Sequence, residues 1–475
     1  MSCPGGNNVA QSKFQQQLDS VEEFERTPVP ESHLKSAGSF LGMYAGEHTA
    51  GTEFVIGPLF VAHGVTAGDL VFGLLVGNLL AVLSWAFLTA PIAAKARMTL
   101  YYMLEKICGA KLTAVYNIVN ALMFCFLAGS MIAVSATAVG IPFDLTMPTL
   151  NDWLPNSLGW IVAVVIIGAV TTVIAMLGYT QVARFAGIAA PWMILVFLAA
   201  AVSVLPELGV TSISDFWGVA NAKIWTGVPL EGQGKFTFWH VMFFAWFCNM
   251  AMHIGMADLS ILRYARKWQY GFTSAAGMYV GHYLAWIASG ILYALFLMES
   301  NYSTEFAPGP VAFRAAGIAG ALCVIVAGWT TANPTIYRAG LAIQSIRPQW
   351  KTWKVTMIVG IITTLAACFP ALVMKLLDFV ALYGLILMPM GAIILMDFYV
   401  LPKIGARSNY AEISGKSFNI AAAAAWLLTL AFSIFLNHWF GVEIFFLGLP
   451  GWFVAAGVYL AVSRLVQKPV QTKTA

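Results

Sequence analysis

Twelve apolar stretches of roughly membrane length run through this chain. A helix that crosses the hydrocarbon core of a bilayer needs about 20 apolar residues, and backbone in lipid must satisfy its own hydrogen bonds. The stretches therefore predict an all-α polytopic membrane protein. They cover residues 37–62, 68–93, 112–140, 157–178, 181–206, 236–257, 270–298, 312–336, 353–372, 376–401, 418–437 and 442–463.

The composition excludes a soluble domain and favours no nucleic-acid partner. Charged residues make up 10% of the chain, against about 25% in soluble domains, and the formal net charge is only +4. The sequence contains no phosphate-binding glycine loop, no zinc-ligand spacing and no nucleophile elbow. We therefore expect no enzymatic activity, and we expect a monomer that contacts membrane lipid and binds a small-molecule substrate.

The distribution of Lys and Arg predicts the orientation of the chain. Cytoplasmic loops of membrane proteins are enriched in these residues. With the N-terminus inside, and without counting the N-terminal tail, eighteen of them fall on the inner side and four on the outer side. This predicts an integral protein of the plasma (inner) membrane with both termini cytoplasmic. The acidic, polar tail 1–36 is expected to be partly disordered.

The first apolar stretch has features that a plain span lacks. Glycines interrupt it, Pro58 removes a backbone donor, and Glu47, His48 and Glu53 place ionisable groups near the bilayer centre. A carboxylate there costs about 2.5–3.5 kcal/mol. These features predict a discontinuous helix whose freed backbone groups line a cavity. The alternative is a kinked helix whose polar groups pair with neighbours, and for Glu47 both interpretations stay open.

The sixth stretch repeats this pattern of glycine and ionisable residues at depth. Asn249 and His253 are four apart and share one helix face, next to the aromatic cluster Phe243–Phe247. Such a face suits a flat, heteroatom-rich ligand. His253 is a candidate proton carrier, or a core histidine bonded to a carbonyl. Two matching stretches in positions one and six predict an inverted repeat.

The eighth stretch carries two adjacent hydroxyls, Thr330 and Thr331. Hydroxyl and carbonyl oxygens suit hard cations, although membrane threonines also bond back to their own helix. Asn333 and Pro334 follow, and we expect the helix to break there, with the Asn333 amide free to reach a ligand.

Four stretches resemble the nucleobase:cation symporter-1 family, especially its cytosine permeases. They are GVTAGDLVFGLLVGNLL (64–80), LRYARK (262–267), WTTANPTIYRAGLAIQSI (329–346) and PMGAIILMDFYV (389–400). The resemblance implies a LeuT-type five-plus-five inverted repeat with two extra C-terminal helices. It also implies uptake of a nucleobase or related nitrogen-rich heterocycle, coupled to sodium or, alternatively, to a proton.

The same resemblance implies positions for both ligands. A sodium ion between the first and eighth spans would contact Gly46, Thr49, Ala50, Ala327, Thr330 and Thr331. Family substrates lie between aromatic side chains and bond to polar groups of spans one and eight. With the polar residues argued above, the expected substrate site comprises Thr52, Glu53, Phe124, Phe247, Asn249, His253 and Asn333.

This chain departs from the family pattern in three ways. No tryptophan occurs between residues 86 and 152, where the family has one in span three, and Ala332 directly follows the threonines. The first stretch is also unusually polar. The departures keep open a cationic amine or amidine-like solute, or a membrane sensor that does not transport.

The expected organisation has six parts. They are a cytoplasmic tail (1–36), a first five-helix repeat (37–206), an outer connection (207–235) that packs as a short surface helix, a second repeat (236–401), spans eleven and twelve (402–465) and a cytoplasmic tail (466–475).

Overall fold

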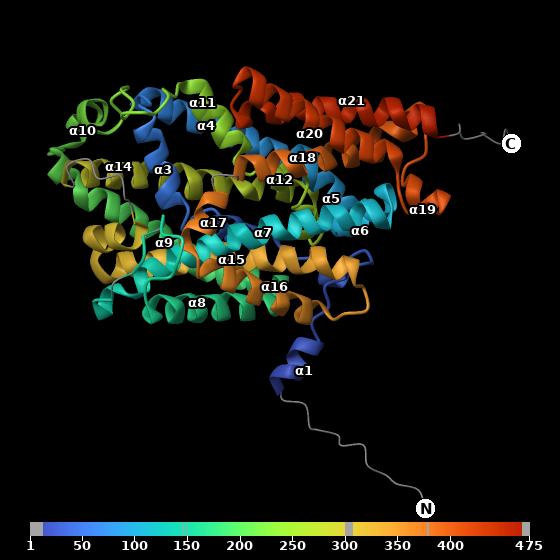
Figure 1. Ribbon diagram of the computed structural model, residues 1–475, viewed down its shortest axis with the longest axis horizontal. Helices are drawn as coiled ribbons and strands as arrows, with labels where there is room; N and C mark the ends of the chain where they lie inside the picture. The colour runs from blue at the N-terminus through green and yellow to red at the C-terminus, as the bar shows by residue number, and fades with distance from the viewer. Residues whose placement is uncertain (1–12, 146, 150, 300–306, 378–379, 468–475) are drawn as a thin grey trace, which may run out of the picture.

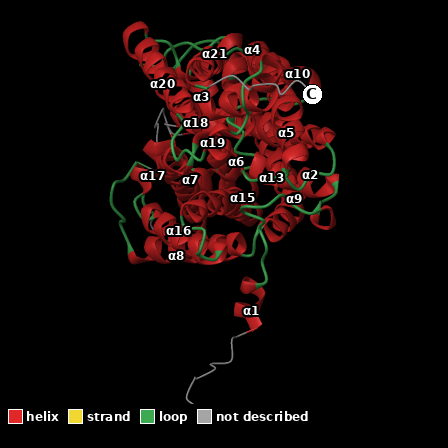
Figure 2. Cartoon of the chain, turned by 90° about the vertical axis from the view of Figure 1, so that its right-hand side faces the viewer, coloured by secondary structure: helices red, strands yellow, loops and turns green. Residues whose placement is uncertain are grey.

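The computed structural model describes residues 13–145, 147–149, 151–299, 307–377 and 380–467. Within these ranges the chain forms helices and loops with two isolated bridges and no strand, as Figure 2 shows. Nine of the described helices are long and apolar enough to cross a membrane, and three shorter helices are also apolar. The expected all-α integral membrane protein is confirmed.

The membrane elements correspond one for one to the predicted stretches. In chain order they are α2 (Ala37–Glu47) with α3 (Glu53–Ala62), α4 (Ala67–Ser84) with α5 (Ala90–Ala96), α7 (Ala110–Val139), α8 (Leu158–Met176), α9 (Tyr179–Leu208), α11 (Phe238–Phe247) with α12 (Met250–His253) and α13 (Leu259–Leu262), η6 (Ala276–Tyr283) with α14 (Leu284–Glu299), α15 (Pro308–Ile346), α16 (Thr352–Ala367), α18 (Val380–Leu395), α20 (Ile420–Phe440) and α21 (Gly448–Val466). Shorter helices between or beside them are α1 (Lys13–Asp19), α6 (Leu100–Cys108), α10 (Ile213–Val219), α17 (Pro370–Leu377) and α19 (Tyr410–Ser414).

The helices pack as two related halves. The helix α2 packs against α9 as α12 packs against α18, and α3 packs against α14 as α11 packs against α4. The third span of each half, α7 and α15, lie side by side, as do the fourth, α8 and α16 (Figure 1). The helices α20 and α21 pack together on the flank away from α8 and α16 (Figures 1 and 2). The outer connection contains α10, as expected.

Both predicted interruptions of the first and sixth spans are present. The helix α2 ends at Glu47 and α3 begins at Glu53, while α11 ends at Phe247 and α12 begins at Met250. The break expected at Asn333 is wrong, because α15 keeps helical geometry through it.

The non-helical residues inside α15 are instead Ala316 and Gly317, the latter with φ of +59°. Proline is tolerated within membrane helices because nearby groups satisfy the backbone that it frees. Pro334 leaves the Thr330 carbonyl without its usual amide partner, and the Thr335 hydroxyl donates to the next carbonyl, that of Thr331, at 2.6 Å.

The described part of the N-terminal segment, residues 13–36, packs against the membrane helices rather than remaining disordered. Glu23 is buried, and its carboxylate accepts hydrogen bonds from Arg263 (3.1 Å), Tyr264 (2.8 Å) and Tyr337 (2.5 Å). Residues 13–36 are therefore ordered, and the expected partial disorder of the tail stays a prediction for the rest of it. The first residues of the 1–36 tail and most of the 466–475 tail lie outside the described residues.

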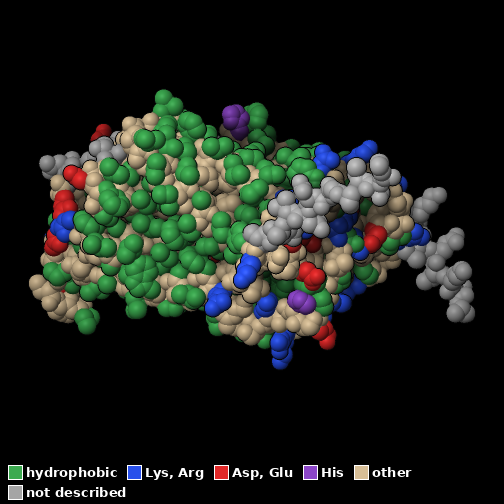
Figure 3. All heavy atoms as spheres, turned by 90° about the horizontal axis from the view of Figure 1, so that it is seen from below, with side chains coloured by type: hydrophobic (Ala, Val, Ile, Leu, Met, Phe, Trp, Pro, Cys, Tyr) green, Lys and Arg blue, Asp and Glu red, His purple; other side chains and the backbone are tan. Residues whose placement is uncertain are grey.

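The surface has a charged end and an apolar middle. Lys and Arg side chains gather toward the end that carries α6 and α19, and the band beside them is largely hydrophobic (Figures 1 and 3). Such a band is the surface that lipid requires.

Candidate functional site

A cavity of about 270 Å³ lies where the two discontinuous helices meet. It lies beside the turn between α2 and α3 and beside the turn between α11 and α12. Its polar lining comprises Glu47, His48, Thr52, Glu53, Asn249, His282 and Thr331. Polar groups of four spans therefore converge on one site.

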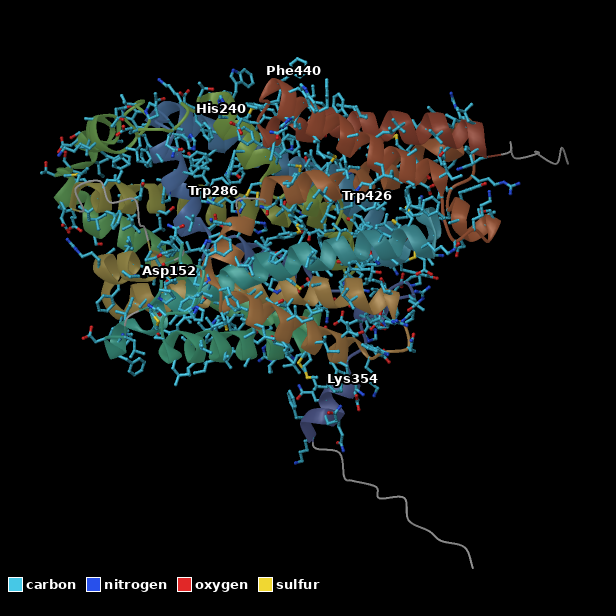
Figure 4. All side chains as sticks on the ribbon, viewed as in Figure 1. Asp152, His240, Trp286, Lys354, Trp426 and Phe440 are labelled. Carbon is cyan, nitrogen blue, oxygen red and sulfur yellow. The ribbon has the colours of Figure 1, made fainter. Side chains whose placement is uncertain are left out.

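Glu53 opens α3 and is held against α14. Gly57 lies one turn later, and a Cβ added to it would clash with the Ser289 hydroxyl, so only glycine permits this close approach. Ser289 donates to the Glu53 carbonyl at 2.6 Å, and the Trp286 indole donates to the Glu53 carboxylate. Figure 4 places Trp286 in the interior beside α3. The close packing leaves Glu53 only 2% exposed.

His282 completes a polar chain with Glu53 and Asn249. Its ring stacks on that of Trp286, four residues later, with centroids 4.4 Å apart. Its Nε2 lies 3.7 Å from Glu53 Oε1 and 3.4 Å from Asn249 Nδ2. Sequence reasoning missed His282 because it stands alone in its span. Only its spacing of four from Trp286 offered a signal, since that spacing puts both rings on one helix face.

Aromatic side chains wall the rest of the cavity. Phe244 and Phe247 line it from α11, and Tyr383 lines it from α18. The Tyr383 hydroxyl is buried and has no hydrogen-bond partner among the described residues. Phe124 packs edge-on behind Tyr383, with ring centroids 5.6 Å apart, and does not reach the cavity.

The structure brings together four of the seven residues expected to bind substrate: Thr52, Glu53, Phe247 and Asn249. Phe124, His253 and Asn333 are fully buried and lie outside the lining. His253 packs against the Trp85 ring, with centroids 4.5 Å apart. The Asn333 amide has no partner among the described residues, because α15 runs on unbroken and keeps it in the helix interface.

A buried ion-pair network lies beside the cavity. Arg338 donates to both carboxylate oxygens of Glu47, at 2.5 and 3.0 Å, and to Asp258 Oδ1 at 2.7 Å. Asp258 Oδ2 also accepts from Tyr44 and Trp85. Glu47 is therefore a paired structural carboxylate. Arg338 lies just beyond the eighth predicted stretch (312–336), but it is a fully buried residue of α15.

Oxygen atoms suited to a small cation lie around Thr331. Its hydroxyl is 2.8 Å from the Glu47 carbonyl oxygen and 3.4 Å from that of Ala327. The neighbouring Thr330 hydroxyl bonds back to Ala327 O at 3.0 Å. Carbonyls of a broken helix together with hydroxyls form the donor set that membrane carriers use for sodium. These residues fit such an ion.

The remaining residues expected around the ion are oriented differently. Gly46 packs against Ala186 of α9, and the Thr49 hydroxyl bonds back to Ala45. Ala50 lines the cavity, where its carbonyl accepts from the Glu53 amide. Among the described residues no three His, Cys, Asp or Glu side chains could hold a metal ion together.

The cavity extends along α3. Its lining follows Val55, Ile56 and Leu59 away from Glu53. On the opposite side of the cavity, along α15, lies the network of Arg338 with Glu47 and Asp258. Beyond it, Tyr337 bonds to Glu23 of the N-terminal segment. Ion pairs therefore separate the cavity from the end of the molecule covered by the N-terminal segment.

Solved structures with the same fold are transporters. The chain matches Mhp1, a nucleobase-cation-symport-1 family transporter in a closed conformation with bromovinylhydantoin bound, with a TM-score of 0.71 at 15% identity over 93% of this chain and 95% of that one. It matches a substrate-bound, outward-open Na⁺-coupled sialic acid symporter with a TM-score of 0.67 at 14% identity over 96% and 95%. It matches MhsT in complex with L-phenylalanine with a TM-score of 0.54 at 14% identity, over 90% of this chain and 99% of that one.

At such low identity these matches show a shared fold. They confirm the LeuT-type architecture with two extra C-terminal helices, and they confirm the resemblance to the nucleobase:cation symporter-1 family as one of fold. No protein-family model matches the chain, and no curated protein sequence matches it significantly.

Proposed function

We propose that this protein is a secondary active transporter that imports a nucleobase or related small nitrogen-rich heterocycle with a cation, by alternating access. The observation that carries the proposal is one cavity at the junction of two discontinuous helices, beside a cluster of cation-binding oxygens. The transporter would lie in the plasma membrane with both termini cytoplasmic. The cavity would then open outward, because the N-terminal segment and the Arg338 network block the inner side.

The size and chemistry of the cavity support a small heterocycle. A volume of about 270 Å³ is near the low end of ligand pockets, which start at roughly 300 Å³. Phe247 and Tyr383 offer faces for a planar ring, and Glu53 and Asn249 offer hydrogen bonds to its edge. Because the Glu53 carboxyl group at the start of α3 is a hydrogen-bond acceptor, the favoured solute carries N–H donors. The hydantoin bound to Mhp1 is a ring of this kind.

Sodium is the favoured coupling ion. The Thr331 hydroxyl and the carbonyl oxygens of Glu47 and Ala327 supply hard ligands. When sodium binds, the hydroxyl would turn its lone pair to the ion instead of donating to Glu47. The Na⁺-coupled sialic acid symporter with this fold supports the assignment.

A cationic amine or amidine-like solute is the second candidate. The observation in its favour is that Glu53 contacts no Lys or Arg among the described residues. A solute cation would compensate that carboxylate directly. The two candidates differ in solute charge and share the cavity.

The test is a thermal-denaturation screen of purified protein with cytosine, uracil, hydantoin and guanidinium, each with and without sodium. A ligand that binds the folded state raises its stability by mass action. We expect a neutral base to give a shift that grows in sodium. Stabilisation by guanidinium alone would favour the cationic solute instead.

Two matched variants test the ion site. Thr331→Val removes the hydroxyl that faces Glu47, whereas Thr335→Val removes one that bonds back to its own helix, a turn away. We expect the sodium effect to disappear in the first and to persist in the second. A full sodium response in Thr331→Val would refute the proposed ion site.

A further inference from the structure

We propose that Glu53 and His282 form a proton-binding site in the cavity wall, and that its proton is carried with the solute. The inference rests on the proposed transport function and adds a second coupling ion to it. It is distinct from the expectation that His253 carries a proton, since His253 lies outside the cavity lining.

The hydrogen-bond directions around His282 indicate the proton. Glu53 Oε2 accepts from Trp286, and Glu53 Oε1 faces His282 Nε2 at 3.7 Å. The Asn249 amide nitrogen lies 3.4 Å from the same Nε2. If Asn249 donates to it, Nε2 carries no hydrogen, and a carboxylate oxygen would face a nitrogen lone pair. A proton on Glu53 removes the negative charge and, with it, this repulsion.

The opposite amide orientation leads to the same conclusion through charge. With the Asn249 oxygen facing the ring, Nε2 would carry a hydrogen that points between Asn249 and Glu53. The Glu53 carboxylate would still keep its full negative charge. The one ion-pair contact of Glu53 among the described residues is His282. Arg338 cannot compensate it, because Glu47 and Asp258 already bind that guanidinium. An unpaired carboxylate at this depth is costly, and a bound proton neutralises it.

The other described titratable groups around the pair form no ion pair with Glu53. His48 meets the His282 ring edge-on, with centroids 4.9 Å apart, and its Nδ1 is bonded to the Tyr44 carbonyl. Cys248 and Tyr383 line the cavity. Glu47 lines it too, but its carboxylate is bound to Arg338. The charge on Glu53 must therefore be balanced by a proton or by the solute itself.

The position of Glu53 links the proton to the solute. A protonated Glu53 still offers carboxyl lone pairs to an N–H of a neutral base. A neutral base can therefore bind the protonated site without leaving an uncompensated charge in the cavity. A cationic solute would instead displace the proton, so the charge of the solute decides between co-transport and exchange.

An infrared difference spectrum between acidic and alkaline buffer tests the site without any solute. In the full-length protein in lipid nanodiscs we expect a protonated-carboxyl band that disappears in Glu53→Gln and moves in His282→Asn. His438→Asn, an exposed residue of α20, is the control and should leave the band unchanged. If Glu53→Gln does not fold, Trp286→Phe should still move the band, because it removes the hydrogen bond to Oε2. A band that none of these cavity variants alters would overturn the proposal.

Uptake into proteoliposomes tests the coupling, with labelled cytosine, uracil and hydantoin as probes. With equal sodium on both sides, a tenfold inside-alkaline proton gradient should drive up to about tenfold accumulation of a neutral base. We expect Glu53→Gln and His282→Asn to lose this response. Uptake that follows a sodium gradient but ignores the proton gradient would overturn the proton site and leave the transport function standing. Absence of uptake under either gradient would overturn the transport function, while the infrared result would still decide the proton site.

Discussion

Replacing Arg338 by glutamine removes the one cation from a buried network of two carboxylates. Arg338 is fully buried and donates three hydrogen bonds to Glu47 and Asp258, which are themselves 7% and 1% exposed. Removing one partner of a buried ion pair costs about 3–5 kcal/mol, because a charge is left unpaired. Here two carboxylates lose their partner, so Arg338→Gln should destabilise the protein by at least that much, or roughly a hundred- to several-thousand-fold in the folding equilibrium.

The same reasoning predicts that neutralising the carboxylates restores stability. In the triple variant Glu47→Gln, Asp258→Asn and Arg338→Gln no buried charge remains, and replacing a whole buried network is often nearly neutral. The assay is equilibrium unfolding in mixed micelles, followed by tryptophan fluorescence. Arg464→Gln, at an exposed site near the end of α21, is the control. A loss below about 1 kcal/mol for Arg338→Gln, or a triple variant as unstable as the single one, would refute the charge argument.

Four further outcomes follow from the described contacts. Glu23→Gln weakens the acceptor for Arg263 and Tyr337, so hydrogen exchange in residues 18–35 should increase, and unchanged exchange would show that the segment is held otherwise. Gly57→Val should destabilise the protein and abolish solute binding through its clash with Ser289, whereas Gly68→Ala, with no neighbour within 4 Å, should do neither. Tyr383→Phe should lower solute affinity by up to about tenfold, the value of one hydrogen bond, without altering the sodium effect. Lys351 and Trp353 hold the pKa of Asp19 below its ordinary value of 3.8, so their contact with α1 is complete above that value, and exchange in α1 should rise only when the pH falls through the lowered pKa.

The sequence predicted the arrangement of spans well because its signals are local. Apolar length defines a span whatever surrounds it, and the glycines and ionisable residues that interrupt the first and sixth stretches lie within them. The sequence did not indicate that residues 13–36 are ordered, because this order comes from distant partners. Glu23 is bonded to Arg263, Tyr264 and Tyr337. No sequence pattern near residue 23 predicts these partners.

The site was predicted in part for the same reason. Residues at the two breaks, such as Glu53 and Asn249, line the cavity because the break itself creates it. His282 and Tyr383 come from stretches that lack the cluster of ionisable residues found in stretches one and six, and they reach the cavity through packing. Phe124 was expected in the wall by position, but it packs edge-on against Tyr383, which lines the cavity instead.

The wrongly expected break in span eight explains why the network around Glu47 escaped the sequence analysis. Thr331 and Arg338 are seven residues apart, which is close to two turns of an unbroken helix. One face of α15 therefore holds Glu47 twice, by its carbonyl through Thr331 and by its carboxylate through Arg338. A break at Asn333 would have turned these two side chains to different faces, and they could not then both bind Glu47. Because the helix is continuous here, Glu47 connects α2 to α15. Through Arg338 and Asp258 it also connects α2 to the discontinuous sixth span. A cation that replaces Thr331 as the partner of the Glu47 carbonyl would therefore bind at the residue that links these three elements.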